Sequence, residues 1–194
     1  MLAYHALFVA LVVGTELFFA GLSIVNVRYG ARTARDRSDW MRETLGVEDV
    51  ESVLDYQRAR VGLSLLETVT TLGFLLLALY SGVVTDVVVA LTETGLSPLL
   101  QGVVFVVLAL LATRLLGVPF DLYSTFVVEE AFDFNNQSPT LWVRDYLLGT
   151  VLSLVIVGGL AAAVLWFVEN VQYWPVAGWA LVVGFSVAML VLKP

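Results

Sequence analysis

Carboxylate and amide side chains gather in one polar stretch of an otherwise apolar second half: Glu129, Glu130, Asp133, Asn135 and Asn136. Paired carboxylates such as Glu129 and Glu130 can perform acid–base chemistry when a metal or a base stands beside them. No such group adjoins them in the sequence. We therefore interpret the pair as docking residues that cap a helix or bind a basic group such as Arg144. The two asparagines predict a turn, since asparagine tolerates left-handed geometry and bonds its own backbone.

The chain offers few ligands for a transition metal. It contains one histidine, His5, and no cysteine. Because zinc sites in proteins are built mainly from several histidine and cysteine ligands, a thiolate or multi-histidine site within this chain is excluded. We expect no catalytic residue, no metal ligand and no cofactor in this chain, and we interpret His5 as an interfacial residue.

Two carboxylates lie inside long apolar runs. Glu16 is near the middle of the first run, where a charged carboxylate costs about 2.5 kcal/mol or more on insertion scales. In the second run, helical spacing places five polar residues on one face: Arg60, Ser64, Glu67, Thr68 and Thr71. We expect Glu16, Ser64, Glu67 and Thr71 to line a polar or water-filled space between helices. The alternative for Glu67 is a carboxylate bonded to a neighbouring backbone or hydroxyl group and needed only for packing.

One basic residue, Arg114, lies inside the third apolar run. Arg114 is about one turn from one end of its run, and Glu67 is about two turns from the matching end of its own. At 1.5 Å per residue these depths differ by a few ångströms. We therefore predict a Glu67–Arg114 ion pair inside the bundle.

The composition is that of a membrane protein. Apolar residues make up 59% of the chain and charged residues only 14%, with a mean hydropathy of +0.90. Soluble domains contain about 45–50% apolar residues. We expect a multi-pass integral membrane protein of a prokaryotic plasma membrane, with the lipid bilayer as a partner and no nucleic acid.

Five runs are long enough to cross the hydrocarbon core, which takes about 20 residues. They predict an all-α polytopic bundle with spans at about 2–27, 61–84, 98–118, 146–168 and 175–192, joined on one side by polar segments 28–60 and 119–145. An amphipathic helix is predicted from about Val47 into the second span. Pro119 is predicted to end the third helix, and Ser138 with Pro139 to begin the next as N-cap and first helical residue.

The charges predict the orientation. Seven arginines lie between Arg28 and Arg60, and Arg114, Arg144 and Lys193 complete the 10 basic residues. With five spans, all of these fall on one side, whereas the opposite loops carry only the acids Asp86, Glu93 and Glu169. The positive-inside rule then places the N-terminus outside and the C-terminus in the cytoplasm, with 119–145 cytoplasmic.

A specific pattern surrounds the polar stretch. It consists of Val118-Pro119-Phe120, Tyr123-Ser124-Thr125-Phe126-Val127-Val128-Glu129-Glu130, Asp133-Phe134-Asn135-Asn136-Gln137-Ser138 and a following Asp145. It resembles the signature of the type I CAAX prenyl endopeptidases: Leu-Pro-Phe, Tyr-Ser-Thr-Phe-Val-Ile-Glu-Glu, Gly-Phe-Asn-Lys-Gln-Thr and an aspartate. The differences include Val128 for Ile, Asp133 for Gly, Asn136 for Lys and Ser138 for Thr. Upstream, Tyr56-Gln57-Arg58-Ala59-Arg60 resembles the segment that precedes the second span of that family.

That resemblance implies an integral-membrane zinc metallopeptidase with a water-filled chamber inside its helices. The H-E-x-x-H helix and distant glutamate that hold zinc in the family are absent from this sequence. The resemblance thus implies that residues 1–194 form a single N-terminal transmembrane domain, and that the zinc catalytic half of the same polypeptide lies beyond Pro194. The substrate would be a peptide or membrane protein, prenylated in eukaryotes. The residues assigned to docking that half are Pro119, Tyr123, Thr125, Phe126, Glu129, Glu130, Phe134, Asn135 and Asp145.

Two other functions fit the sequence. A non-enzymatic membrane scaffold would have kept the fold and lost the protease half. A small transporter or channel component would use Glu16 and Glu67. The reading frame after Pro194 separates the protease from the scaffold, and solute flux that is lost on Glu67→Gln would indicate the transporter.

Overall fold

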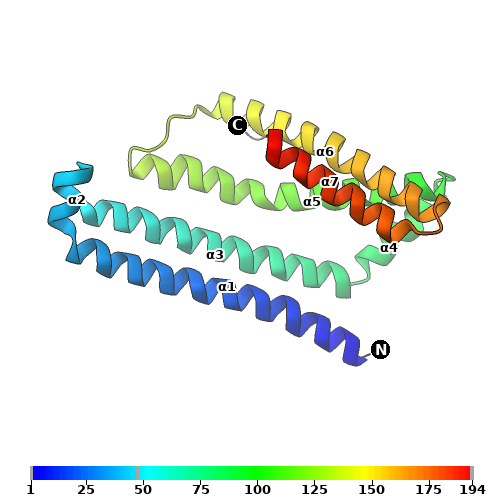
Figure 1. The fold of residues 1–194 in the computed structure, drawn as a ribbon, viewed down its shortest axis with the longest axis horizontal. Coiled ribbons are helices and arrows are strands. Elements are labelled where there is room, and N and C mark those ends of the chain that lie inside the picture. The colour runs from blue at the N-terminus through cyan, green and yellow to red at the C-terminus, as the bar shows by residue number, and fades with distance from the viewer. Residues whose placement is uncertain (1, 47–48, 193–194) are drawn as a thin grey trace. The chain divides into compact units, whose positions relative to one another are not determined.

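The structure, a computed structural model, describes residues 2–46 and 49–192, and in these ranges it contains helices and no strands. The helices are α1 (Leu2–Asp36), α2 (Ser38–Leu45), α3 (Val50–Tyr80), α4 (Val83–Glu93), α5 (Pro98–Tyr123), the π-helix η1 (Ser124–Glu129), α6 (Pro139–Asn170) and α7 (Trp174–Leu192) (Figure 1). The prediction of an all-α chain is confirmed. Val47, the predicted start of the amphipathic helix, and Lys193 lie outside the described residues.

Five helices are long and apolar enough to cross a membrane: Ala3–Asp36, Val50–Tyr80, Pro98–Glu129, Pro139–Asn170 and Trp174–Leu192. Their number matches the predicted five spans. A helix of 31 residues is about 46 Å long, which exceeds the roughly 30 Å hydrocarbon core. Four of the five helices are therefore long enough to project beyond the core.

The second helix ends earlier than predicted. α3 stops at Tyr80 and not near residue 84, because the backbone breaks at Gly82, whose φ of 93° suits glycine. The residues after the break, predicted as a short outer segment, form α4.

The predicted end of the third helix at Pro119 is wrong. Pro119 lies inside α5, which continues to Tyr123 and then into η1. A proline removes one helical hydrogen bond, but ending a helix close to the membrane would leave several backbone groups unbonded. Most of the predicted loop 119–145 is therefore helical, and only residues 132–138 are not.

The polar segment 28–60 is also mostly helical. α1 runs through its first residues to Asp36, and α2 ends where Gly46 takes a φ of 67° that favours glycine. α3 begins at Val50, and the carboxylate of Asp49 accepts a hydrogen bond from the Ser52 amide at 3.1 Å. Asp49 thus caps the start of α3, where the helix dipole also favours an acid.

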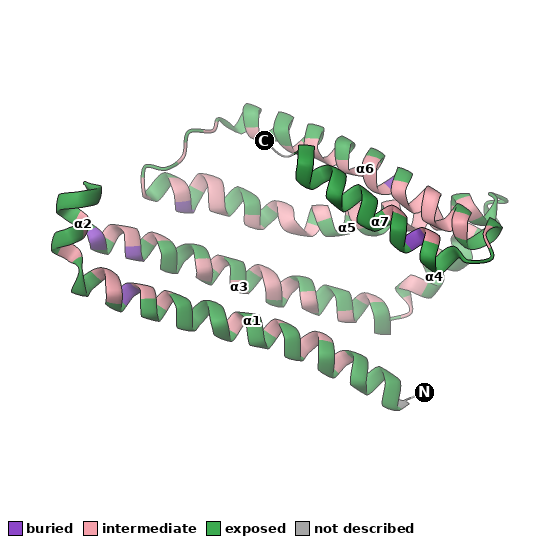
Figure 2. Cartoon of the chain, viewed as in Figure 1, coloured by how far each residue is buried: buried purple, intermediate pink, exposed green. Residues whose placement is uncertain are grey.

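The chain divides into two compact units: unit 1 is Met1–Leu77 with Leu116–Gln137, and unit 2 is Ala78–Leu115 with Ser138–Pro194. In unit 1 the buried residues Ala31, Val50 and Leu54 pack together, joined by Ala34 and Met41 (Figure 2). This cluster connects the end of α1 to the start of α3. Most large apolar side chains elsewhere are exposed, as suits helices surrounded by lipid.

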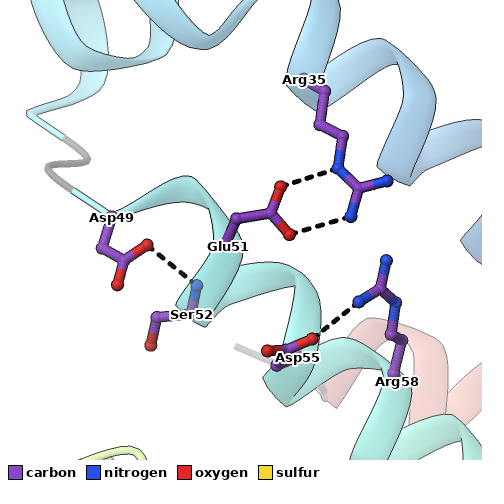
Figure 3. A network of polar contacts seen from close by, with 6 residues as sticks. All are labelled: Arg35, Asp49, Glu51, Ser52, Asp55 and Arg58. Carbon is purple, nitrogen blue, oxygen red and sulfur yellow. Dashed lines mark hydrogen bonds and ion pairs between the residues drawn. The ribbon is translucent and has the colours of Figure 1, made fainter.

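Charged groups brace the same junction of α1 and α3 (Figure 3). Arg35 donates to both carboxylate oxygens of Glu51, at 2.7 and 2.9 Å. One turn further along α3, Arg58 donates to Asp55 at 2.7 Å. Arg35–Glu51 joins α1 to α3, whereas Arg58–Asp55 lies within α3. Both pairs are exposed, so each adds little to stability.

In unit 2, α6 packs against α7, and it approaches the first part of α5 closely. Gly158 of α6 is buried, and a Cβ placed on it would lie 3.6 Å from Val107 Cγ2. A small residue here lets the two helices come together, as is common between membrane helices.

Candidate functional site

The signature-like segment from Val118 to Ser138, called the motif below, folds back onto α3 at its polar end. The ring of Tyr56 meets Phe132 at a centroid distance of 5.5 Å and Phe134 at 4.8 Å, both edge to face. Such aromatic pairs contribute about 0.5–1.5 kcal/mol each beyond the area they bury. Residues 132–134 are therefore held against the start of the second long helix and do not hang free.

A turn of specific geometry follows. Asp133 has a φ of 59°, the Asn135 side chain donates to Glu130 Oε2 at 2.9 Å, and Asn135 Oδ1 accepts the Gln137 amide at 2.8 Å. The predicted turn is present, and Asn135 bonds its own backbone as expected. The left-handed residue, however, is Asp133, which the prediction had not identified.

The backbone around the two glutamates is closely bonded. The carbonyl of Glu129 accepts hydrogen bonds from the amides of Phe132 and Phe134, at 3.3 and 2.8 Å. Ser138 caps α6 by accepting the Leu141 amide at 3.3 Å, which confirms that prediction. Glu129 is half-buried, whereas Glu130 is exposed and bonds Asn135. The acid pair is thus part of a folded segment, residues 129–137, which we call the cap. The Glu130 carboxylate is hydrogen-bonded within this cap.

The motif also borders an apolar hollow of about 470 Å³ in unit 1. Its lining comes from α3 on one side and from α5 and η1 on the other: Ala59, Gly62, Leu63, Leu66, Pro119, Phe120, Tyr123 and Val128. Val128 is only 6% exposed. Thr125 and Phe126 lie half-buried in the same π-helix, and π-helical turns are frequent at functional sites.

The intramembrane carboxylates share a second hollow. Glu16 of α1 and Glu67 of α3, both half-buried, line a space of about 260 Å³ together with Thr68 and Thr71. Ser64, predicted on the same face, is not among its lining residues. A Cβ on Gly117 would lie 3.8 Å from Glu67 Oε1, so this carboxylate lies against α5.

The half-buried Arg114 has partners in unit 2 that the sequence did not indicate. Its Nη2 donates to Ser153 Oγ at 2.6 Å, and its carbonyl accepts the Tyr146 hydroxyl at 3.0 Å. Tyr146 in turn stacks on Trp142 at 5.1 Å. A hydroxyl in an apolar run at the depth of an arginine was the available signal for Ser153. The Glu67–Arg114 pair stays a prediction. Asp145, predicted with the motif, lies on α6.

Comparison with known proteins places these features in a family. A family model described as CAAX prenyl protease N-terminal, five membrane helices, matches residues 26–194. The chain belongs to this family. The matched residues include the whole motif and Tyr56 with its ring contacts to Phe132 and Phe134. They also include both hollows, apart from the α1 residues before residue 26.

Individual CAAX prenyl proteases are similar over about half of the chain. A CAAX prenyl protease 1 homolog of Arabidopsis thaliana is 31% identical over 108 residues, which are 54% of this chain and 26% of the relative. The homolog of Mus musculus is 27% identical over 105 residues, 52% of this chain and 22% of the relative. A probable CAAX prenyl protease 1 of Schizosaccharomyces pombe is 34% identical over 89 residues, 43% of this chain and 18% of the relative. The aligned part thus spans about a quarter of these relatives or less.

Among residues 2–46 and 49–192 no three histidine or acidic side chains lie close enough to hold a metal ion. The chemistry of the described chain is that of a structured acidic cap, an apolar hollow and a polar hollow, all in unit 1.

Proposed function

We propose that this domain forms part of the intramembrane chamber of a zinc metalloendopeptidase and docks its catalytic half. That half would supply the zinc ligands and the general base, and the enzyme would cleave membrane-associated or prenylated proteins. The membership in the CAAX prenyl protease family supports this proposal, as does the similarity to CAAX prenyl protease 1 homologs that are several times longer than the aligned part. The relatives named are eukaryotic, and the prokaryotic plasma membrane stays a prediction.

The observation that carries the docking proposal is the structure of the motif. A simple connector between membrane helices does not need a π-helix, ring contacts between Tyr56 and Phe134, and a turn closed by the Asn135–Glu130 hydrogen bond. This cap presents exposed acidic groups, Glu130 and Asp133, beside the exposed ring of Phe134. The exposed ring suits a folded partner region because aromatic residues are enriched at interfaces, and the exposed carboxylates can pair with basic groups of that partner.

The chamber proposal rests on the hollow between α1 and α3. Glu16 and Glu67 are too costly to leave facing lipid, and they share a polar space with two threonine hydroxyls. Carboxylates and hydroxyls on facing helices are the lining expected of a water-filled interior.

The absence of cysteine from the chain gives a clean test of the side on which the cap lies. A single cysteine at the exposed Asn136 should react with a membrane-impermeant maleimide in inverted membrane vesicles and not in intact cells. A matched cysteine at Thr92 of α4, predicted on the opposite side, should show the reverse pattern. Labelling of Asn136→Cys in intact cells would contradict the cytoplasmic docking role.

A further inference from the structure

The apolar hollow beside the motif is shaped by small side chains. Ala59 and Gly62 face it from α3, and a Cβ placed on Gly62 would meet no atom within 4 Å. The space of about 470 Å³ is thus empty where a larger residue would fit. Hollows of about 300–1,000 Å³ with apolar walls are typical of small-ligand sites.

Charge gathers at one end of this hollow. Arg58 and Arg60 flank Ala59, the first of its lining residues along α3, and both are exposed. Arg58 donates a hydrogen bond to Asp55. Among the side-chain hydrogen bonds of the described residues, Arg60 donates to a neutral partner, the Tyr56 hydroxyl at 3.4 Å. Neither described ion pair uses Arg60. Among the described residues, Arg60 therefore has no carboxylate partner, and it directly follows the lining residue Ala59 along α3.

This combination matches one component of the bilayer. An anionic phospholipid carries a phosphate that pairs with arginine and acyl chains that gain about 0.8 kcal/mol for each buried methylene group. Basic residues near the membrane surface attract such lipids, which are enriched in the cytoplasmic leaflet. The predicted orientation places Arg58 and Arg60 at that leaflet.

We propose that the hollow binds one acyl chain of an anionic phospholipid, with the head group at Arg60. The lipid would fill the space between α3 and the α5–η1 helix, against Pro119 and Tyr123. Its binding would hold the motif-bearing π-helix against the second long helix.

Native mass spectrometry tests this site. The chain is reconstituted in bilayers of mixed phosphatidylglycerol and phosphatidylcholine, released, and the bound lipid is identified. The wild type should retain phosphatidylglycerol. Gly62→Leu should retain at least about tenfold less phosphatidylglycerol. If its side chain keeps only two methylene groups of the acyl chain from being buried, the lost binding free energy already corresponds to that ratio. Ala59→Leu, which fills the hollow from a second position, should reduce the retained phosphatidylglycerol by a similar factor.

Gly73→Leu is the matched control. Gly73 lies on the same helix, a Cβ there also meets no atom within 4 Å, and it does not line the hollow. Gly73→Leu should retain lipid like the wild type, and Arg60→Gln should lose the preference for phosphatidylglycerol. The proposal is overturned if the wild type retains no lipid, if it retains phosphatidylcholine or free fatty acid equally well, or if both hollow-filling variants retain lipid normally.

Discussion

Aspartate in place of Val128 should unfold the motif-bearing part of unit 1. Val128 of η1 is 6% exposed and lines the apolar hollow shared with α3, so the new carboxylate would be buried without a partner. Burying a charge in this way costs about 3 kcal/mol or more. Because a domain has only about 5–15 kcal/mol of stability in total, the yield of monodisperse protein in detergent should fall sharply, together with its thermal midpoint.

The neighbouring residue provides the control. Val127 belongs to the same π-helix but is 46% exposed, and it lies in the segment 119–145 that is predicted to be cytoplasmic. Val127→Asp should therefore leave both the yield and the midpoint within the range of surface substitutions, about 0.5 kcal/mol. Equal tolerance of the two aspartates would show that η1 does not pack as described here. An equal loss of yield and midpoint in the two variants would show that both faces of η1, and not only the buried one, are destabilised by a charge.

Reversing the charge of Glu67 or of Arg114 should each disrupt the membrane domain. An unpaired charge within a span costs about 2.5–3.5 kcal/mol on insertion scales, and each single reversal would place two like charges where the sequence predicts an ion pair. The double variant Glu67→Arg with Arg114→Glu should recover most of the folded yield. Size-exclusion chromatography of detergent extracts measures all three.

Ser153→Ala separates the predicted pair from the bond that the structure contains. It removes the acceptor 2.6 Å from Arg114 Nη2 but keeps both charges, so it should lower stability by about 1–3 kcal/mol. Combined with either single charge reversal, it should not recover the folded yield. If the effects of the two single reversals simply add in the double variant, within about 0.5 kcal/mol, Glu67 and Arg114 are not partners.

Composition and periodicity were sufficient for the all-α class and for the number of helices long enough to span a membrane. Long apolar runs have one stable backbone in a bilayer, the helix, and polar interruptions separate them. The ends of the helices were predicted less accurately from the sequence. Proline is a reliable stop in water, where freed groups bond solvent, but α5 continues through Pro119, and a π-helix is not encoded by any simple pattern.

The site was predictable in content and not in arrangement. Residue types indicated Glu16 and Glu67 as polar groups inside apolar runs and predicted a turn at Asn135 and Asn136. That Glu16 and Glu67 share one hollow, and that Tyr56 clamps Phe132 and Phe134, depends on which helices pack together. Spacing within one helix does not contain that information. Ser153 was missed for the same reason, since a lone hydroxyl in an apolar run is common.

The central claim is that this membrane domain works with a zinc-bearing half of its own polypeptide, docked on the cap formed by residues 129–137. The direct measurement is the intact mass and zinc content of the polypeptide as purified from its native membrane. We expect a mass well above 21.2 kDa, about one zinc ion per polypeptide as in single-site metallopeptidases, and an H-E-x-x-H peptide in its digest. A native polypeptide of 21.2 kDa, or a longer one without a zinc-binding helix, would contradict the claim.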